Sequence, residues 1–137
     1  MADLPDLSQP AASLSAAEEA EVRSTVEEWT SCLGHDWDRW IDYYDESAVV
    51  LVPGERRLSG RDAIARYVRA IFGDVERLGF EHWSIDGSGD LAVVDNDMVR
   101  RDAGESEDRV AKQIVVLRRT EPGRWVVTRV AFGSPGG

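Results

Sequence analysis

The sequence predicts an α+β fold in which helices cover one face of a curved antiparallel sheet. Apolar residues recur at helical spacing through the first half of the chain, and after Gly79 the spacing changes to the alternation typical of strands. Short turns rich in Gly, Asp and Pro separate the later strands, so consecutive strands should pair as an antiparallel meander. A chain of 137 residues fits one domain with one core.

Three helices are expected before the meander. Ser15 and Glu18 form a capping-box pattern at the start of the first helix, and Gly34 is placed to end it. Asp36 is the predicted cap of the second helix, and the segment 59–62 is the predicted cap of the third. The apolar faces of these helices are Val22, Val26, Trp29 and Leu33, then Trp37, Trp40, Ile41 and Tyr44, then Ile64, Tyr67, Ile71, Val75 and Leu78.

Five strands complete the predicted fold. One lies between the second and third helices, and four follow the third helix. Their expected ranges are 47–53, 80–86, 91–101, 108–119 and 124–133. The last two strands are apolar on both faces, whereas a sheet with one wet face should alternate. A second copy of the chain would cover the outer face, so we expect a homodimer through it.

Composition narrows the classes of partner. The chain has 26 acidic and 16 basic residues and a net charge of −10, which disfavours nucleic acid and anionic membranes. Residues 1–14 lack a basic start and are expected to form a flexible arm before a domain at 15–133 and a tail at 134–137. The single cysteine, Cys32, suits a reducing cytoplasm. Lys112 is the single lysine, a preference for arginine that is typical of GC-rich bacterial genomes.

The order and spacing of several short segments resemble a known family. They are Gly34 to Asp36, Tyr43 to Val50, Gly60 to Ile64, Val116 to Arg119, and Gly123 to Val127. Across about residues 15–133 the chain resembles the SnoaL-like branch of the nuclear transport factor 2-like superfamily. This resemblance implies a cone-shaped sheet wrapped around three N-terminal helices, with an internal pocket open at the wide end and dimers formed through the sheet.

The resemblance does not imply one reaction, because this fold hosts enzymes and non-enzymes. The positions that match the two acids of ketosteroid isomerases hold Val52 and Val115. The positions that match the charged set of limonene epoxide hydrolases hold Asn96, Met98 and Val130. The His–Asp pair of SnoaL-type cyclases has no counterpart on the expected strands.

The expected pocket is mostly apolar with uncharged polar groups. Its predicted lining residues are Trp29, Tyr44, Tyr67, Ile71, Asn96, Met98, Gln113, Val115, Thr128 and Val130. Such a lining is typical of small-molecule sites and could position a carbonyl or hydroxyl group. Asn96 and Gln113 are the strongest pointers, since an amide that faces a cavity needs a ligand, a water or a neighbour as its partner. Mutual pairing of the two amides is the simpler alternative.

Two titratable residues are candidates for a catalytic base. Asp97 would enter the pocket if the register of residues 91–101 slipped by one position, and Asp95 would follow it; otherwise both are solvated carboxylates. His82 lies on the first meander strand and could act as an acid or base near neutral pH, although a lone strand histidine is more often structural. No metal site and no cofactor are expected, because two distant histidines and one cysteine make no recognisable ligand set.

Three functions remain open at this point. The first is a cofactor-independent isomerase, cyclase or dehydratase acting on a small apolar, oxygenated or polyketide-like molecule. The second is a non-catalytic dimer of the same fold that binds such a molecule. The third is a protein-interaction module. A titratable side chain inside the cone would favour the first, and a pocket without one would favour the second.

Overall fold

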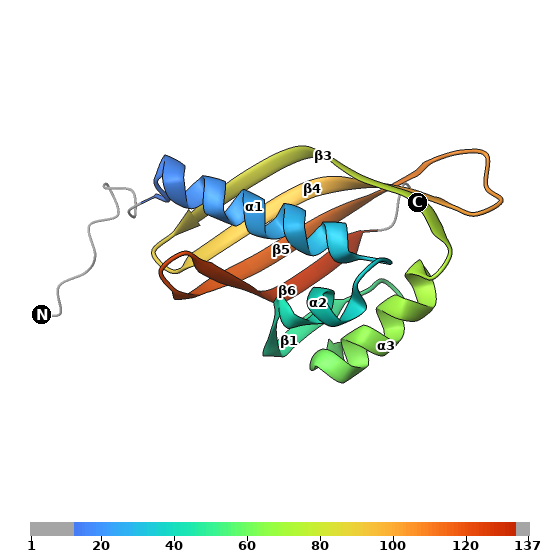
Figure 1. Ribbon diagram of the computed structural model, residues 1–137, viewed down its shortest axis with the longest axis horizontal. Helices are drawn as coiled ribbons and strands as arrows, with labels where there is room; N and C mark the ends of the chain where they lie inside the picture. The colour runs from blue at the N-terminus through green and yellow to red at the C-terminus, as the bar shows by residue number, and fades with distance from the viewer. Residues whose placement is uncertain (1–12, 134–137) are drawn as a thin grey trace, which may run out of the picture.

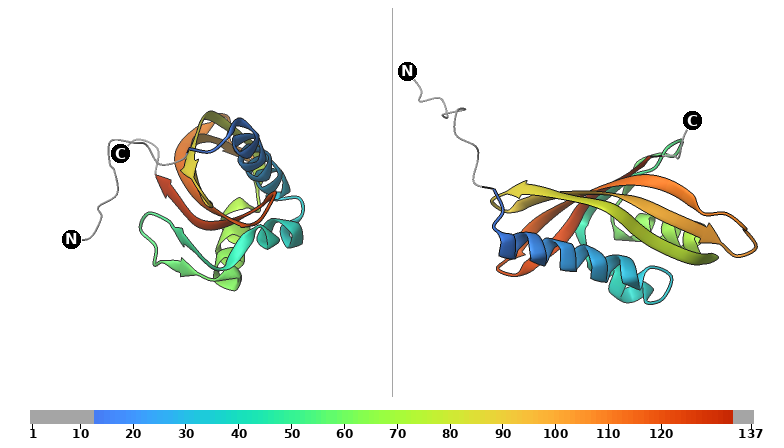
Figure 2. Two further views of the ribbon diagram at one scale, coloured as in Figure 1. Left: turned by 90° about the vertical axis from the view of Figure 1, so that its left-hand side faces the viewer. Right: turned by 90° about the horizontal axis from the view of Figure 1, so that it is seen from above.

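The computed structural model describes residues 13–133. Its helices are α1 (Ala16–Cys32), α2 (Trp37–Asp42) and α3 (Arg61–Phe72). Its strands are β1 (Tyr44–Leu51), β2 (Leu58–Ser59), β3 (Val75–Ser88), β4 (Leu91–Asp102), β5 (Arg109–Glu121) and β6 (Arg124–Gly133). The strands form one curved sheet, and α1 runs along its concave side, as Figures 1 and 2 show. The predicted α+β fold is confirmed.

The sheet is mixed rather than antiparallel throughout. Its strand order is β2-β1-β6-β5-β4-β3, and β3 to β6 form the expected meander. Strand β1 pairs in parallel with β6, with Tyr44 opposite Val127 and Val50 opposite Val130. After β1 the chain forms the short strand β2, which pairs antiparallel with β1, and it reaches the other edge of β1 only with its last strand. The pairing of β1 with β6 could therefore not be read from local turns.

The boundary between α3 and β3 differs from the expected one. Helix α3 ends at Phe72, whereas Val75 and Leu78, which continue its apolar spacing, belong to β3. The backbone here is held by the sheet, because Val75 pairs with Asp102 of β4. Long-range strand pairing therefore overrides a local helical pattern. The predicted capping box of α1 is present: the Ser15 hydroxyl accepts from the Glu18 N–H at 3.1 Å.

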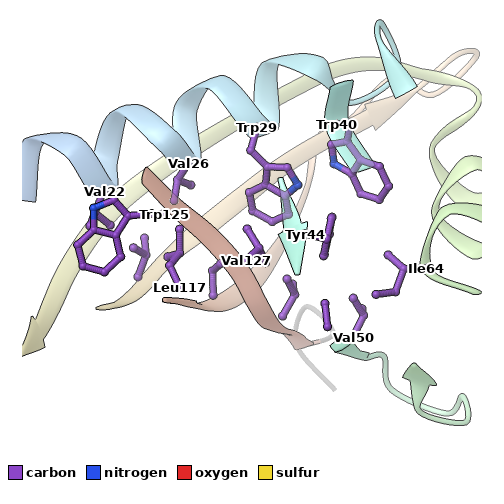
Figure 3. Close-up of a cluster of buried hydrophobic side chains, with 14 of the residues drawn as sticks. Val22, Val26, Trp29, Trp40, Tyr44, Val50, Ile64, Leu117, Trp125 and Val127 are labelled. Carbon is purple, nitrogen blue, oxygen red and sulfur yellow. The ribbon is translucent and has the colours of Figure 1, made fainter. Parts of the chain in front are cut away.

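The core lies between α1 and the concave side of the sheet. Figure 3 shows Trp29 of α1, Trp40 of α2 and Tyr44 of β1 side by side. The Tyr44 ring meets Trp29 and Trp40 edge to face, with centroids 5.5 and 5.0 Å apart. The Arg61 guanidinium donates two hydrogen bonds, of 3.0 and 2.7 Å, to the Tyr44 carbonyl and so fixes α3 against the start of β1.

The ends of the predicted domain are only partly described. Ser13 forms a bridge with Ser88, and Leu14 is buried in the core cluster. Residues 1–12 of the predicted arm and the predicted tail 134–137 lie outside the described residues. Within residues 13–133, no helix combines the length and the apolar character needed to cross a membrane.

Candidate functional site

The register of β4 places one amide inside the cone. Buried and exposed residues alternate along this strand, and Asn96 and Met98 are buried whereas Asp95 is exposed. Because side chains of a strand alternate between its two faces, Asp97 points to the outer face of the sheet. Strand β4 therefore places the neutral amide of Asn96 in the interior, and not the carboxylate of Asp97.

Asn96 lies directly opposite Gln113 of β5. Both residues are only 3% exposed, and they are the only buried polar or charged residues within the described part of the chain. Asn96 Nδ2, Asn96 Oδ1 and Gln113 Nε2 have no hydrogen-bond partner among residues 13–133, so the two amides do not pair with each other through Asn96. A buried amide without a partner costs about 1–3 kcal/mol, which makes these two groups an energetic anomaly of the fold.

Gln113 opens onto a small cavity, called here the inner cavity. Its volume is about 20 Å³, room for roughly one water-sized group. Its lining residues are Trp29, Thr30, Leu33, Trp40, Tyr44, Val68, Phe72, Phe80, Met98, Gln113 and Phe132. The indole N–H of Trp29 is buried and makes no well-formed hydrogen bond within the described residues, although it lies close enough to the Tyr44 hydroxyl to oppose the rise in the pKa of Tyr44. The inner cavity is thus almost filled, and the space that remains borders unpartnered polar atoms.

A much larger groove lies between the second half of α1 and β3, called here the α1–β3 groove. It has about 690 Å³ of space and combines apolar side chains with charged ones. Four residues line both this groove and the inner cavity, and they form the boundary between the two: Thr30, Leu33, Phe72 and Phe80. Glu27 and Arg23 on its α1 side form an ion pair of 2.8 Å.

A second groove, the α3–β6 groove, lies beside the end of α3 and has about 320 Å³ of space. It shares Phe72, Met98 and Phe132 with the inner cavity, and Ile71 also lines it. Phe72 therefore borders both grooves and the cavity between them. The Arg100 guanidinium lies 4.4 Å from the Phe72 ring centroid and donates a hydrogen bond to the Ile71 carbonyl, which holds this corner in place.

The position of Arg100 depends on Asp102. The Asp102 carboxylate accepts two hydrogen bonds from Arg100, of 2.9 and 3.1 Å, and one from Arg109 of 2.9 Å. The hydrogen bond from Arg100 is the main cause that lowers the pKa of Asp102, and partial burial opposes it. The folded protein therefore favours the ionised carboxylate.

We expect Asp102→Asn to be less stable than the wild type at neutral pH, with a difference that shrinks in acid. A carboxyl whose pKa is lower in the folded protein stabilises the fold at any pH above its pKa in the unfolded chain, about 3.9. This stabilisation is lost as the pH falls through the pKa of the folded protein. Urea unfolding of both proteins between neutral pH and about pH 3 measures this. Asp38→Asn, whose side chain is fully exposed, is the control. A difference that stays constant with pH would contradict the prediction.

The aromatic hydroxyls do not provide a base. Burial raises the pKa of Tyr44 well above its usual value, so the hydroxyl stays protonated. Tyr67 is half-buried on α3, and burial, followed by the charge of Glu55, raises its pKa too. Tyr67 packs against the core but does not line the inner cavity or either of the two grooves.

The two candidate bases lie outside the cone. His82 occupies a bulge of β3, where Glu81 pairs with Asp97 and Ser84 with Asp95, and its φ of 56° is the left-handed conformation. Its ring Nδ1 is 2.9 Å from the Asp97 carboxylate, and the His82 side chain is 75% exposed. The structure therefore brings the two residues together, but on the outer face and not in the predicted pocket.

Other predicted lining residues are also placed differently. Strand β6 has an extra residue at Thr128, because Val116 pairs with Arg129 and Leu117 with Val127. The Thr128 hydroxyl donates to the Val116 carbonyl at 3.0 Å instead of facing the cavity. Asn96, Val115 and Val130 are buried in the core without lining the inner cavity, whereas Trp29, Tyr44, Met98 and Gln113 line it.

Sequence reasoning missed the residues that separate the cavity from the grooves. Phe72 and Phe80 flank the segment in which the predicted helix ran too far, and the apolar pattern assigned neither of them to the pocket. Thr30 is a polar residue next to the apolar stripe of α1, so the stripe alone gave no signal for it. For metal ions, no group of three or more His, Cys, Asp or Glu residues within 13–133 is arranged to bind one.

Comparison with known proteins gives a consistent family and fold. The family model described as "SnoaL-like domain" matches residues 22–128. No curated protein matches the chain. An NTF2-like protein of unknown function from Pseudomonas putida KT2440 is similar, with a TM-score of 0.77, 19% identity, and coverage of 90% of this chain and 91% of that one.

Two further solved structures have names that refer to enzymes. A ketosteroid isomerase-like protein from Erwinia carotovora atroseptica SCRI1043 has a TM-score of 0.75 and 19% identity, covering 90% of this chain and 99% of its own. A protein from Streptomyces avermitilis, provisionally named a dehydratase of the NTF2-like family, has a TM-score of 0.73 and 18% identity, covering 88% and 97%. At these identities the similarity shows the fold alone.

Proposed function

The chain belongs to the SnoaL-like domain family, and on that premise we propose that it binds a small, largely apolar, oxygen-bearing molecule without transforming it. The observation that carries the proposal is the buried, unpartnered amide of Gln113 beside a cavity, with the equally unpartnered amide of Asn96 opposite it on β4. The body of the ligand would lie in the α1–β3 groove, whose volume falls within the range of ligand pockets. Its polar end would reach the inner cavity.

Binding is favoured over catalysis by the chemistry of the interior. General-base catalysis needs a base within hydrogen-bond reach of the proton that it removes. Among the described residues, those lining the inner cavity include no carboxylate and no imidazole. Asp97 and His82 lie on the other face of the sheet, and the Tyr44 hydroxyl stays protonated. The neutral donors and acceptors that remain can orient a ligand.

One observation supports the enzyme alternative. Glu27, Glu76 and His35 line the α1–β3 groove, where a ligand of the proposed kind would touch them. A cofactor-independent isomerase, cyclase or dehydratase would therefore have its acid or base at the groove and not in the cavity. Incubation of a bound ligand with the wild type and with Glu27→Gln separates the two functions, since turnover that depends on Glu27 would establish the enzyme.

We expect Leu33→Trp to abolish ligand binding, because Leu33 lies on the boundary between the groove and the inner cavity. A larger side chain there would fill the floor of the groove. Calorimetric titration with ethylnaphthalene and acetylnaphthalene measures the effect. Leu91→Trp, on an exposed residue at the start of β4, is the matched control and should bind as the wild type does. Failure of both probes to bind the wild type would overturn the proposed function.

We also propose that the chain forms a homodimer through the outer face of the sheet. Val93 of β4, Ile114 of β5 and Leu51 of β1 are 40%, 50% and 42% exposed. Ile114 and Leu51 both pair with Ala131 of β6, so an apolar patch crosses the middle of the sheet. Apolar side chains grouped in this way favour association over solvent exposure. A second copy would bring the same patch against itself.

We expect the wild type to sediment as a dimer and Ile114→Lys to sediment as a monomer. A lysine in the middle of the patch would have to be desolvated in both copies, which costs more than the lost contact. Analytical ultracentrifugation at several protein concentrations measures the assembly. Ser24→Lys, on the exposed side of α1, should leave it unchanged. A wild type that remains at the 15.2 kDa of one chain would contradict the proposal.

A further inference from the structure

We propose that the inner cavity recognises a neutral carbonyl oxygen, so that the ligand is an apolar ketone, ester or related carbonyl compound. This inference rests on the binding function proposed above and names the chemical class of the ligand. It follows from three features of the site: the balance of donors and acceptors, the size of the cavity, and the absence of cationic side chains from its described lining.

Donors outnumber acceptors among the unpartnered atoms. The two unpartnered atoms on residues that line the cavity, Trp29 Nε1 and Gln113 Nε2, are both donors. Asn96, whose Nδ2 and Oδ1 also lack partners, lies opposite Gln113 on β4 but does not line the cavity. Turning either amide by half a turn would exchange its oxygen and nitrogen, but the indole nitrogen of Trp29 can only donate. The cluster therefore lacks acceptors, and a ligand satisfies it best by supplying one.

The size of the inner cavity limits what can enter it. A volume of about 20 Å³ holds roughly one water-sized group, so a carbonyl oxygen fits whereas a ring does not. The α1–β3 groove has room for the rest of the molecule. Leu33 and Phe80 lie on the shared boundary, and the oxygen would pass between the groove and the cavity there.

The charge of the lining distinguishes a carbonyl from a carboxylate. No Lys, Arg or His is among the described residues that line the inner cavity. A buried carboxylate without a cation is strongly unfavourable, whereas a neutral oxygen needs only hydrogen-bond donors. The Tyr44 hydroxyl, protonated because burial raises its pKa, borders the same cavity as a further possible donor.

The test compares four naphthalene derivatives that share one apolar body. They are acetylnaphthalene, the alcohol obtained by reducing it, ethylnaphthalene and naphthoate. Calorimetric titration should give a dissociation constant for the ketone about tenfold lower than for ethylnaphthalene, as expected for one well-formed buried hydrogen bond. The alcohol should lie between them, because its own donor competes for the few acceptors, and naphthoate should bind more weakly than the ketone.

Trp29→Phe keeps an aromatic ring but removes the N–H, and it should reduce the tenfold preference to about threefold or less. Trp125→Phe is the matched control, because the Trp125 N–H already donates to the Glu21 carboxylate at 3.4 Å and Trp125 lines neither the inner cavity nor the α1–β3 groove. This variant should keep the full preference. If Trp29→Phe does not fold, Gln113→Leu replaces it, with the same expected loss of preference.

The outcomes separate this inference from the function on which it rests. Equal affinity for acetylnaphthalene and ethylnaphthalene would overturn carbonyl recognition and leave apolar ligand binding intact. Tightest binding of naphthoate would overturn it in favour of an anionic ligand. A preference that survives in Trp29→Phe and in Gln113→Leu would remove these donors from the recognition of the oxygen. No binding of any of the four compounds would overturn the proposed function itself.

Discussion

Tyr44→Ala is expected to lower the free energy of unfolding by about 3–5 kcal/mol, the range measured for removal of buried aromatic side chains. Tyr44 is 2% exposed and contacts Trp29 and Trp40 edge to face (Figure 3). Its backbone pairs with Val127 of β6 and accepts the hydrogen bonds of Arg61. The substitution would leave a cavity where four elements meet, and little of the ring's contact could be recovered by relaxation.

Tyr43→Ala is the matched control for this prediction. Tyr43 is adjacent but only half-buried, and its hydroxyl donates to Glu28 at 3.0 Å near the surface. Urea unfolding should show a much smaller loss for Tyr43→Ala, with the dependence on urea concentration unchanged in both variants. Tyr44→Phe separates the ring from the hydroxyl and should keep most of the stability. Equal losses at the two positions would contradict the described packing of Trp29, Tyr44 and Trp40.

The local signals in the sequence predicted α1 and the meander well, whereas α2 ends at Asp42 and Tyr44, expected on its apolar face, belongs to β1. The capping box of Ser15 and Glu18 depends on residues three apart, and the structure contains it. The sequence left the register of residues 91–101 open between Asn96 and Asp97, and the structure places Asn96 inward, as the family resemblance implied. Asn96 and Gln113 were identified as the strongest pointers because an amide that faces a cavity needs a hydrogen-bond partner.

The remaining errors come from features that no local pattern carries. A single extra residue reverses the parity of a strand, so at the bulge Val127 and not the predicted Thr128 lies in the core, whereas Val130 beyond the bulge is buried as expected. The bulge at His82 likewise shifts the pairing of β3 with β4 between Glu81 and Ser84. The boundary of α3 depended on the pairing of Val75 with Asp102, which lies on a strand formed later in the chain. Phe72, which borders both grooves, follows the predicted apolar face of α3 by one position and was not assigned to the pocket.

The structure leads to an unusual expectation for Gln113→Leu, namely that the variant is more stable than the wild type. Leucine has a similar size and no polar atom, so it removes the cost of a buried amide whose Nε2 has no partner. We expect a gain of about 1–3 kcal/mol in the free energy of unfolding, measured by urea titration. The same variant should lose its preference for a carbonyl ligand.

In Gln113→Leu we expect stability to rise and the preference for a carbonyl ligand to fall. This combination distinguishes a binding residue from a structural one. A side chain whose role is packing should not destabilise the protein. A side chain whose role is to bind a ligand can destabilise the ligand-free protein. Thr128→Val tests the contrast, because the Thr128 hydroxyl has a partner in the Val116 carbonyl and its loss should destabilise by about 1 kcal/mol. If Gln113→Leu destabilised the protein as well, the amide would be satisfied in the ligand-free protein, and the carbonyl oxygen would lose its main partner in the cavity.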